Sequence, residues 1–76
     1  MNIISPPDGW KEHTIYIVKA SHHKYNPVHF ALLHVGFLNK DKTPGAYSKV
    51  WQNSYDEPYD ITELYSVEYV KELCKI

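Results

Sequence analysis

Two apolar runs in the first half of the chain have the length and composition of β-strands. His13–Ala20 is rich in β-branched and aromatic residues, with Ile15 and Ile17 on one side and Tyr16 and Val18 on the other. Both sides are apolar at the centre of this run. The pattern predicts a first strand that is partly covered on both faces.

Val28–Leu38 is the most apolar run in the chain. In a strand, one face would carry Val28, Phe30, Leu32 and His34, and the other would carry His29, Ala31, Leu33, Val35 and Phe37. The second face is nearly continuous and is expected to form core. A helix over Phe30–His34 is the alternative, but the valines, the phenylalanines and Gly36 favour a strand with Gly36 at a bulge.

A hairpin loop with a Pro44-Gly45 turn is expected over Asn39–Gly45, and a third strand after it. In this third strand one face is aromatic and the other small and polar. The aromatic face carries Tyr47, Lys49, Trp51, Asn53 and Tyr55, and the opposite face carries Ser48, Val50, Gln52 and Ser54.

The last part of the chain has the periodicity of an amphipathic helix. Asp60 and Glu63 have the spacing of a helix-start box, and Ser66 is a second candidate cap. From Ser66 onward, one side of a helical wheel collects Val67, Tyr69, Val70, Leu73, Cys74 and Ile76, with Glu68, Lys71, Glu72 and Lys75 opposite. A C-terminal helix is therefore predicted.

These elements predict an α+β fold, with a small three-stranded antiparallel sheet and one C-terminal amphipathic helix packed on it. Residues 1–76 form a single small domain, in which residues 1–10 are an extended lead-in pinned by Trp10. The alternative is all-β. If Thr62–Val70 is a strand, the chain has the five short strands of an SH3-like barrel.

Composition points to a cytoplasmic chain, of the host cell if a phage encodes it. Cys74 is the only cysteine, which excludes an internal disulfide and indicates a reducing compartment. The first fifteen residues lack the apolar run of a signal peptide. The longest apolar stretch is far shorter than the roughly 20 residues that a bilayer requires.

Charge is divided along the chain although the net charge is only −1. The middle is basic, and from Tyr55 onward acidic residues dominate. Arginine is absent, which removes the best bidentate ligand for phosphates and base edges. The absence of arginine therefore weighs against recognition of nucleic acid.

The chain offers little material for catalysis or metal binding, so no enzyme, no cofactor and no metal site is predicted. Adjacent residues of an extended chain point to opposite sides, as His22 and His23 would, and His29 and His34 would lie on opposite faces of their strand. The four histidines would therefore not converge on one metal ion. Cys74 lies on the apolar side of the predicted helix, where burial makes a thiol inert. With three glycines in the chain, no phosphate-binding loop is present.

Tyrosine is unusually frequent, with seven tyrosines and two tryptophans in 76 residues. Such side chains are enriched at protein interfaces, although small folds also use them as core. The first hypothesis is a non-enzymatic protein-interaction module that docks an acidic, tyrosine-rich surface on a larger protein. The expected contact residues are Tyr55, Asp56, Glu57, Tyr59, Asp60, Glu63 and Tyr65.

In type alone, such small arginine-free chains with one cysteine resemble phage-encoded inhibitors of host factors. The resemblance implies an inhibitor of a larger host protein. If that protein is a nucleic-acid-processing enzyme, the acidic cluster of Asp56, Glu57, Asp60 and Glu63 would occupy its phosphate-binding groove.

The second hypothesis is a single-stranded nucleic-acid binder. Tyr47, Lys49 and Trp51 would form a stacking platform on the third strand, flanked by other lysines. The near-neutral net charge counts against this hypothesis, because neutralising phosphates supplies most of the affinity of such proteins. A homodimer is a further possibility, since a long apolar sheet edge would favour self-association.

Overall fold

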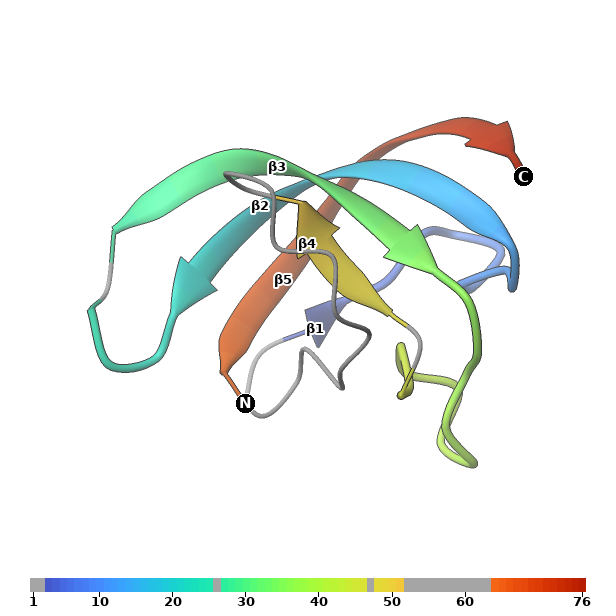
Figure 1. The fold of residues 1–76 in the computed structure, drawn as a ribbon, viewed down its shortest axis with the longest axis horizontal. Coiled ribbons are helices and arrows are strands. Elements are labelled where there is room, and N and C mark those ends of the chain that lie inside the picture. The colour runs from blue at the N-terminus through green and yellow to red at the C-terminus, as the bar shows by residue number, and fades with distance from the viewer. Residues whose placement is uncertain (1–2, 26, 47, 52–63) are drawn as a thin grey trace.

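A computed structural model describes residues 3–25, 27–46, 48–51 and 64–76. They form one five-stranded sheet in the order β1-β5-β2-β3-β4 (Figure 1). Its strands are β1 (Ile3–Ile4), β2 (Thr14–His22), β3 (Val28–Val35), β4 (Lys49–Trp51) and β5 (Tyr65–Lys75). β1 runs parallel to β5, and the other neighbours are antiparallel.

The predicted C-terminal helix is wrong, because Tyr65–Lys75 is the longest strand of the sheet and pairs with β2 along its length. The register of this pair shifts at two places, and each shift leaves one extra residue in β5, Val70 and Leu73. Two β-bulges in one strand break the two-residue alternation. The apolar residues of β5 therefore follow a spacing close to that of a helix.

The predicted α+β class is accordingly wrong, and the described part of the chain is all-β, which is compatible with the SH3-like alternative. The first two predicted strands are present as β2 and β3, while β3 ends at Val35, before Gly36. The third is described over Lys49–Trp51. The extended lead-in contains a short strand, β1, which pairs with β5 at Val67 and Glu68.

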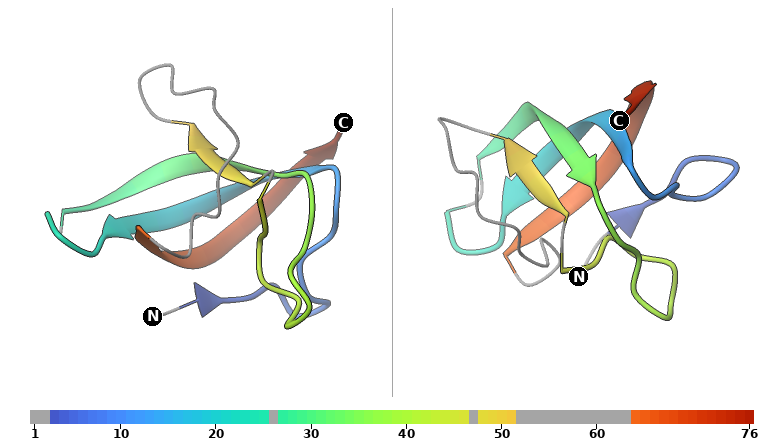
Figure 2. Two further views of the ribbon diagram at one scale, coloured as in Figure 1. Left: turned by 60° about the horizontal axis from the view of Figure 1, so that its bottom comes forward. Right: turned by 45° about the vertical axis from the view of Figure 1, so that its right-hand side comes forward.

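The core lies on one side of the sheet only. Figure 2 shows β1 and the segment after β3 on the same side of the curved sheet. The buried apolar residues on this inner side are Trp10, Tyr16, Val18, Ala20, Ala31, Leu33, Val35, Val50 and Val67. The sheet and this irregular layer together enclose the core, so no helix is needed to cover the inner face.

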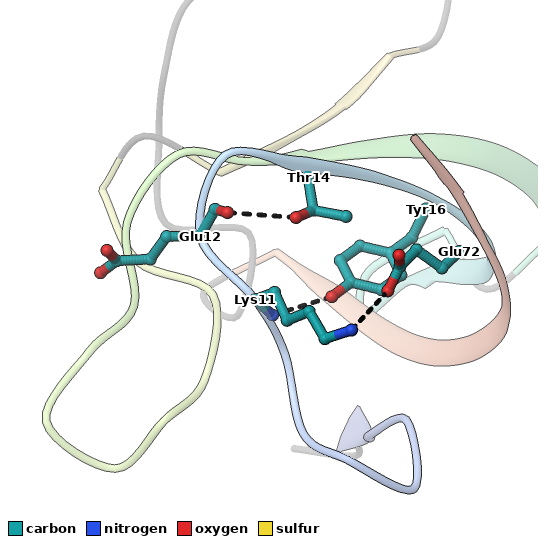
Figure 3. Close-up of polar contacts among 5 residues, drawn as sticks. All are labelled: Lys11, Glu12, Thr14, Tyr16 and Glu72. Carbon is teal, nitrogen blue, oxygen red and sulfur yellow. Dashed lines mark hydrogen bonds and ion pairs between the residues drawn. The ribbon is translucent and has the colours of Figure 1, made fainter. Parts of the chain in front are cut away.

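The N-terminal segment is held against the inner face by aromatic contacts and by the polar contacts that Figure 3 shows. The Trp10 ring meets Tyr16 edge-on with centroids 4.9 Å apart. The backbone N–H of Lys11 donates to the Tyr16 hydroxyl over 2.8 Å, and the Lys11 ammonium lies 3.2 Å from a Glu72 carboxylate oxygen. These contacts connect the lead-in to β2 and β5 and close the inner side.

The segment between β3 and β4 folds back as a turn, as expected. Asn39 N–H donates to the Thr43 carbonyl over 2.7 Å, and Leu38 and Pro44 form an isolated bridge. Gly45 packs closely here, since an added Cβ would lie 3.0 Å from Asn39 Oδ1 and 3.2 Å from the Phe37 carbonyl oxygen and would require these neighbours to shift slightly.

None of the described residues belongs to a helix long and apolar enough to cross a membrane.

Candidate interaction surface

The side of the sheet opposite the core carries a second apolar face. It is named the outer face, and strand register defines its residues, because cross-strand partners lie on the same side. They are Ile4 of β1, Ile15, Ile17, Lys19 and Ser21 of β2, Val28, Phe30, Leu32 and His34 of β3, Lys49 of β4, and Ser66, Glu68, Lys71 and Cys74 of β5.

Large apolar side chains of the outer face are open to solvent. Val28 and Phe30 are each 67% exposed and Leu32 is 38% exposed, whereas Leu33, next in the same strand, is fully buried on the inner side. Ile4 is 57% exposed. Isolated exposed apolar residues are ordinary, but a contiguous apolar patch on one sheet face is typical of an interaction site.

Two hollows indent the outer face. The first is lined by eight residues, two of them charged: Ile4, Lys19, Ala20, Ser21, Val28, Ser66, Val67 and Glu68. It is about 250 Å³ in volume. Small serines at the centre of the sheet between larger aliphatic residues explain this depression.

The second hollow is shallower and is lined by Ile17, Phe30 and Leu32, with Ala31. Lys19 and Phe30 form the cross-strand pair between the two hollows.

The charged groups of the outer face are mainly cationic. The Lys19 ammonium lies over the Phe30 ring, 5.7 Å from its centroid, in a cation–π contact. Lys71 is opposite Ile17, and Lys49 is opposite His34. Glu68, opposite Lys19 on the β5 side, is the acidic residue in this set. Among the described residues of the outer face, three lysines and one carboxylate therefore surround an apolar centre.

On the outer face, the imidazole of His34 has a lowered pKa. Partial burial, followed by the positive charges of Lys49 and His13, lowers the pKa of the His34 imidazole below its ordinary value of 6.5. A neutral imidazole at physiological pH suits a surface whose centre is apolar.

The acidic docking residues predicted from the sequence fall mostly outside the described residues. Tyr55, Asp56, Glu57, Tyr59, Asp60 and Glu63 lie in the range 52–63. Tyr65 is described and is half-buried, with its ring edge-on to His22 at 5.2 Å and to His29 at 6.5 Å between centroids. Tyr65 also packs against the core.

The predicted nucleic-acid platform is partly described. Tyr47 lies outside the described residues, and the side chain of Trp51 is likewise not described. The backbone register nevertheless pairs Trp51 with Leu32 and Lys49 with His34, so these positions belong to the outer face. Ser48 and Val50 alternate with them and are buried, so the small face of the predicted third strand is the core face.

The described residues hold no group of three or more histidine, cysteine or acidic residues that could bind a metal ion. His22 accepts a hydrogen bond at Nδ1 from the Lys24 backbone N–H over 3.0 Å. Cys74 was expected to be buried, but it is exposed, because it lies on a strand opposite Ile15 instead of on the apolar side of a helix.

Sequence reasoning did not select Val28, Phe30 and Leu32 as functional residues, although it placed them on one face. The available signal was that β3 is apolar on both faces. A chain of 76 residues has one core, so a central strand that is apolar on both sides must leave one side open or covered by a partner.

Comparisons of this chain with protein-family models, with curated proteins and with solved structures find no match. The function is therefore inferred from the geometry of the outer face.

Proposed function

We propose that this protein is a non-enzymatic protein-interaction module whose binding surface is the outer face. The observation that carries the proposal is the exposure of Val28 and Phe30, each 67% open to solvent on the outer side of β3, where they pair with Ser21 and Lys19 of β2. The cost of exposing such side chains is recovered when a partner covers them. An aliphatic and aromatic centre with a charged rim is the usual anatomy of a protein interface.

The proposal keeps the class of function expected from the sequence but moves the binding surface to the outer face. A further acidic surface over Tyr55–Glu63, and action as an inhibitor of a larger enzyme, stay predictions.

The test is affinity capture from a lysate of the native cells, with nuclease present. The interface variant is Phe30→Ser with Leu32→Ser, which removes two exposed side chains of β3. The matched control is Phe37→Ser with Leu64→Ser, because these residues are of the same types, are 46% and 43% exposed, and lie outside the strands.

A partner retained by the wild type and the control but lost by the interface variant is expected. Retention of every partner by the interface variant would contradict the proposal.

A second candidate, a single-stranded nucleic-acid binder, is favoured by one observation. The register brings the positions of Lys49 and Trp51 to the face that holds Phe30 and Lys19. Exposed aromatic rings among lysines can stack bases and neutralise phosphates.

Binding of a fifteen-nucleotide oligothymidine that weakens steeply between 50 and 200 mM salt would support this candidate. Salt-tolerant capture of a protein through nuclease treatment would support the first.

A further inference from the structure

The Lys19–Phe30 contact joins the two hollows of the outer face, since Lys19 lines the first and Phe30 lines the second. On β2, Ser21 and Lys19 line the first hollow, with Glu68 opposite Lys19, and Ile17 lines the second. Four residues of a strand span about 13 Å. The surface therefore offers apolar, cationic and apolar sites in a line.

We propose that the outer face binds an acidic peptide segment that inserts one apolar side chain into each hollow and places a carboxylate at Lys19. This inference rests on the proposed function and specifies the chemistry of the partner.

Charge complementarity selects the partner. The Lys19 ammonium leans toward β3 and lies over Phe30, away from Glu68 on the β5 side. The solvated side of that ammonium is available to an anion, because Lys19 is exposed. Lys71 is also exposed. It lies on β5 opposite Ile17, which is on the same face of β2 as Lys19 and two residues before it. A partner with carboxylates beside its apolar anchors meets two cations, whereas a basic partner meets two like charges.

The hollows determine the spacing of the anchors. An extended segment rises about 3.3 Å per residue, so side chains at positions i and i+4 are about 13 Å apart and point the same way. A carboxylate at i+2 then faces Lys19. The first hollow, about 250 Å³ in volume with Ile4 and Val28 in its lining, accepts a side chain of the size of leucine or isoleucine.

The charge of the proposed binding surface is opposite to the one expected from the sequence. An acidic surface of this chain was expected to meet a basic partner, and its residues are mostly outside the described part. The outer face instead has a basic rim, so its partner is acidic.

The test is selection from a displayed library of random 12-residue peptides on the immobilised wild-type protein, with counter-selection on the Phe30→Ser, Leu32→Ser variant. Enriched peptides are expected to be net acidic and to carry apolar residues at i and i+4 with Asp or Glu at i+2.

Affinities of the enriched peptides are then measured with charge variants. Lys19→Glu with Lys71→Glu is expected to weaken binding about tenfold, since two favourable rim contacts become repulsive. Lys40→Glu with Lys42→Glu changes the net charge equally in the exposed turn and is expected to stay within about twofold of wild type.

Each other result contradicts the inference in a distinguishable way. Neutral or basic peptides that still depend on Phe30 and Leu32 would overturn the acidic partner but leave the proposed function standing. Failure to enrich any peptide that discriminates the wild type from the interface variant would overturn both. Tighter binding of fifteen-nucleotide oligothymidine than of any peptide, abolished by Lys19→Glu, would replace the peptide with a nucleic acid.

Discussion

Leu32 and Leu33 are neighbours of identical chemistry on opposite faces of β3, so they provide a matched test of the two faces. Leu33 is fully buried, and Leu32 is 38% exposed. Truncation of a buried leucine to alanine removes its transfer free energy and leaves a cavity, which costs about 2–5 kcal/mol. Truncation of Leu32 leaves no enclosed cavity and is expected to cost about 1 kcal/mol.

The free energy of unfolding is measured by urea denaturation with intrinsic fluorescence, to which the buried Trp10 contributes. A core of this size supplies only about 3–5 kcal/mol, so Leu33→Ala is expected to be near its unfolding midpoint without denaturant. Measuring all variants in an osmolyte such as sucrose keeps that variant folded.

A milder pair repeats the comparison if Leu33→Ala does not fold. Val35 is fully buried and Val28 is 67% exposed, so Val35→Ala is expected to be the more destabilising substitution. Equal losses for Leu32→Ala and Leu33→Ala would refute the assignment of one buried and one open face.

Three further outcomes are expected. Tyr16→Phe removes the acceptor of the Lys11 N–H and should cost about 1 kcal/mol at neutral pH in urea denaturation. Burial raises the pKa of the Tyr16 hydroxyl above its ordinary 10.0, so wild-type stability should be complete below that pH and fall as pH rises beyond it, and the Phe variant should lose less. The lowered pKa of His34 affects stability in the opposite direction, because the folded protein favours the neutral imidazole. Wild-type stability should be complete above pH 6.5 and decline as the pH falls below it. Thermal denaturation of His34→Gln between pH 7 and pH 5 should show a smaller decline. Cys74 is exposed, so Ellman's reagent should titrate it in the native protein as fast as after addition of urea; slow native labelling would mean that β5 is misplaced at its end.

The first two strands could be predicted because their runs are rich in β-branched and aromatic residues. In β3, the expected inner residues Ala31, Leu33 and Val35 are buried as predicted, whereas Phe37, expected on the same face, lies beyond the strand and is 46% exposed. β5 could not be predicted by periodicity, since bulges at Val70 and Leu73 displace its apolar residues from a two-residue spacing. Only the pairing with β2, a long-range contact, decides between helix and strand.

The candidate site was harder to predict than the fold. Alternation along the sequence places Val28, Phe30 and Leu32 on the face of β3 opposite the core residues. It does not show which face of the sheet the rest of the chain covers. That depends on where the lead-in and the segment after β3 fold, and both lie on the inner side (Figure 2). The cationic rim also depends on register, because Lys19 and Lys71 are far apart in sequence and belong to adjacent strands.

The most direct test of the outer face is a methyl NMR titration of the isotope-labelled protein with the partner recovered by capture. Methyl groups report on side chains, so they separate two residues whose backbone amides are adjacent. The account predicts that the methyl signals of Val28 and Leu32 shift or broaden while those of Leu33 and Val35 stay in place. Unchanged Val28 and Leu32 signals in a saturated complex would contradict it.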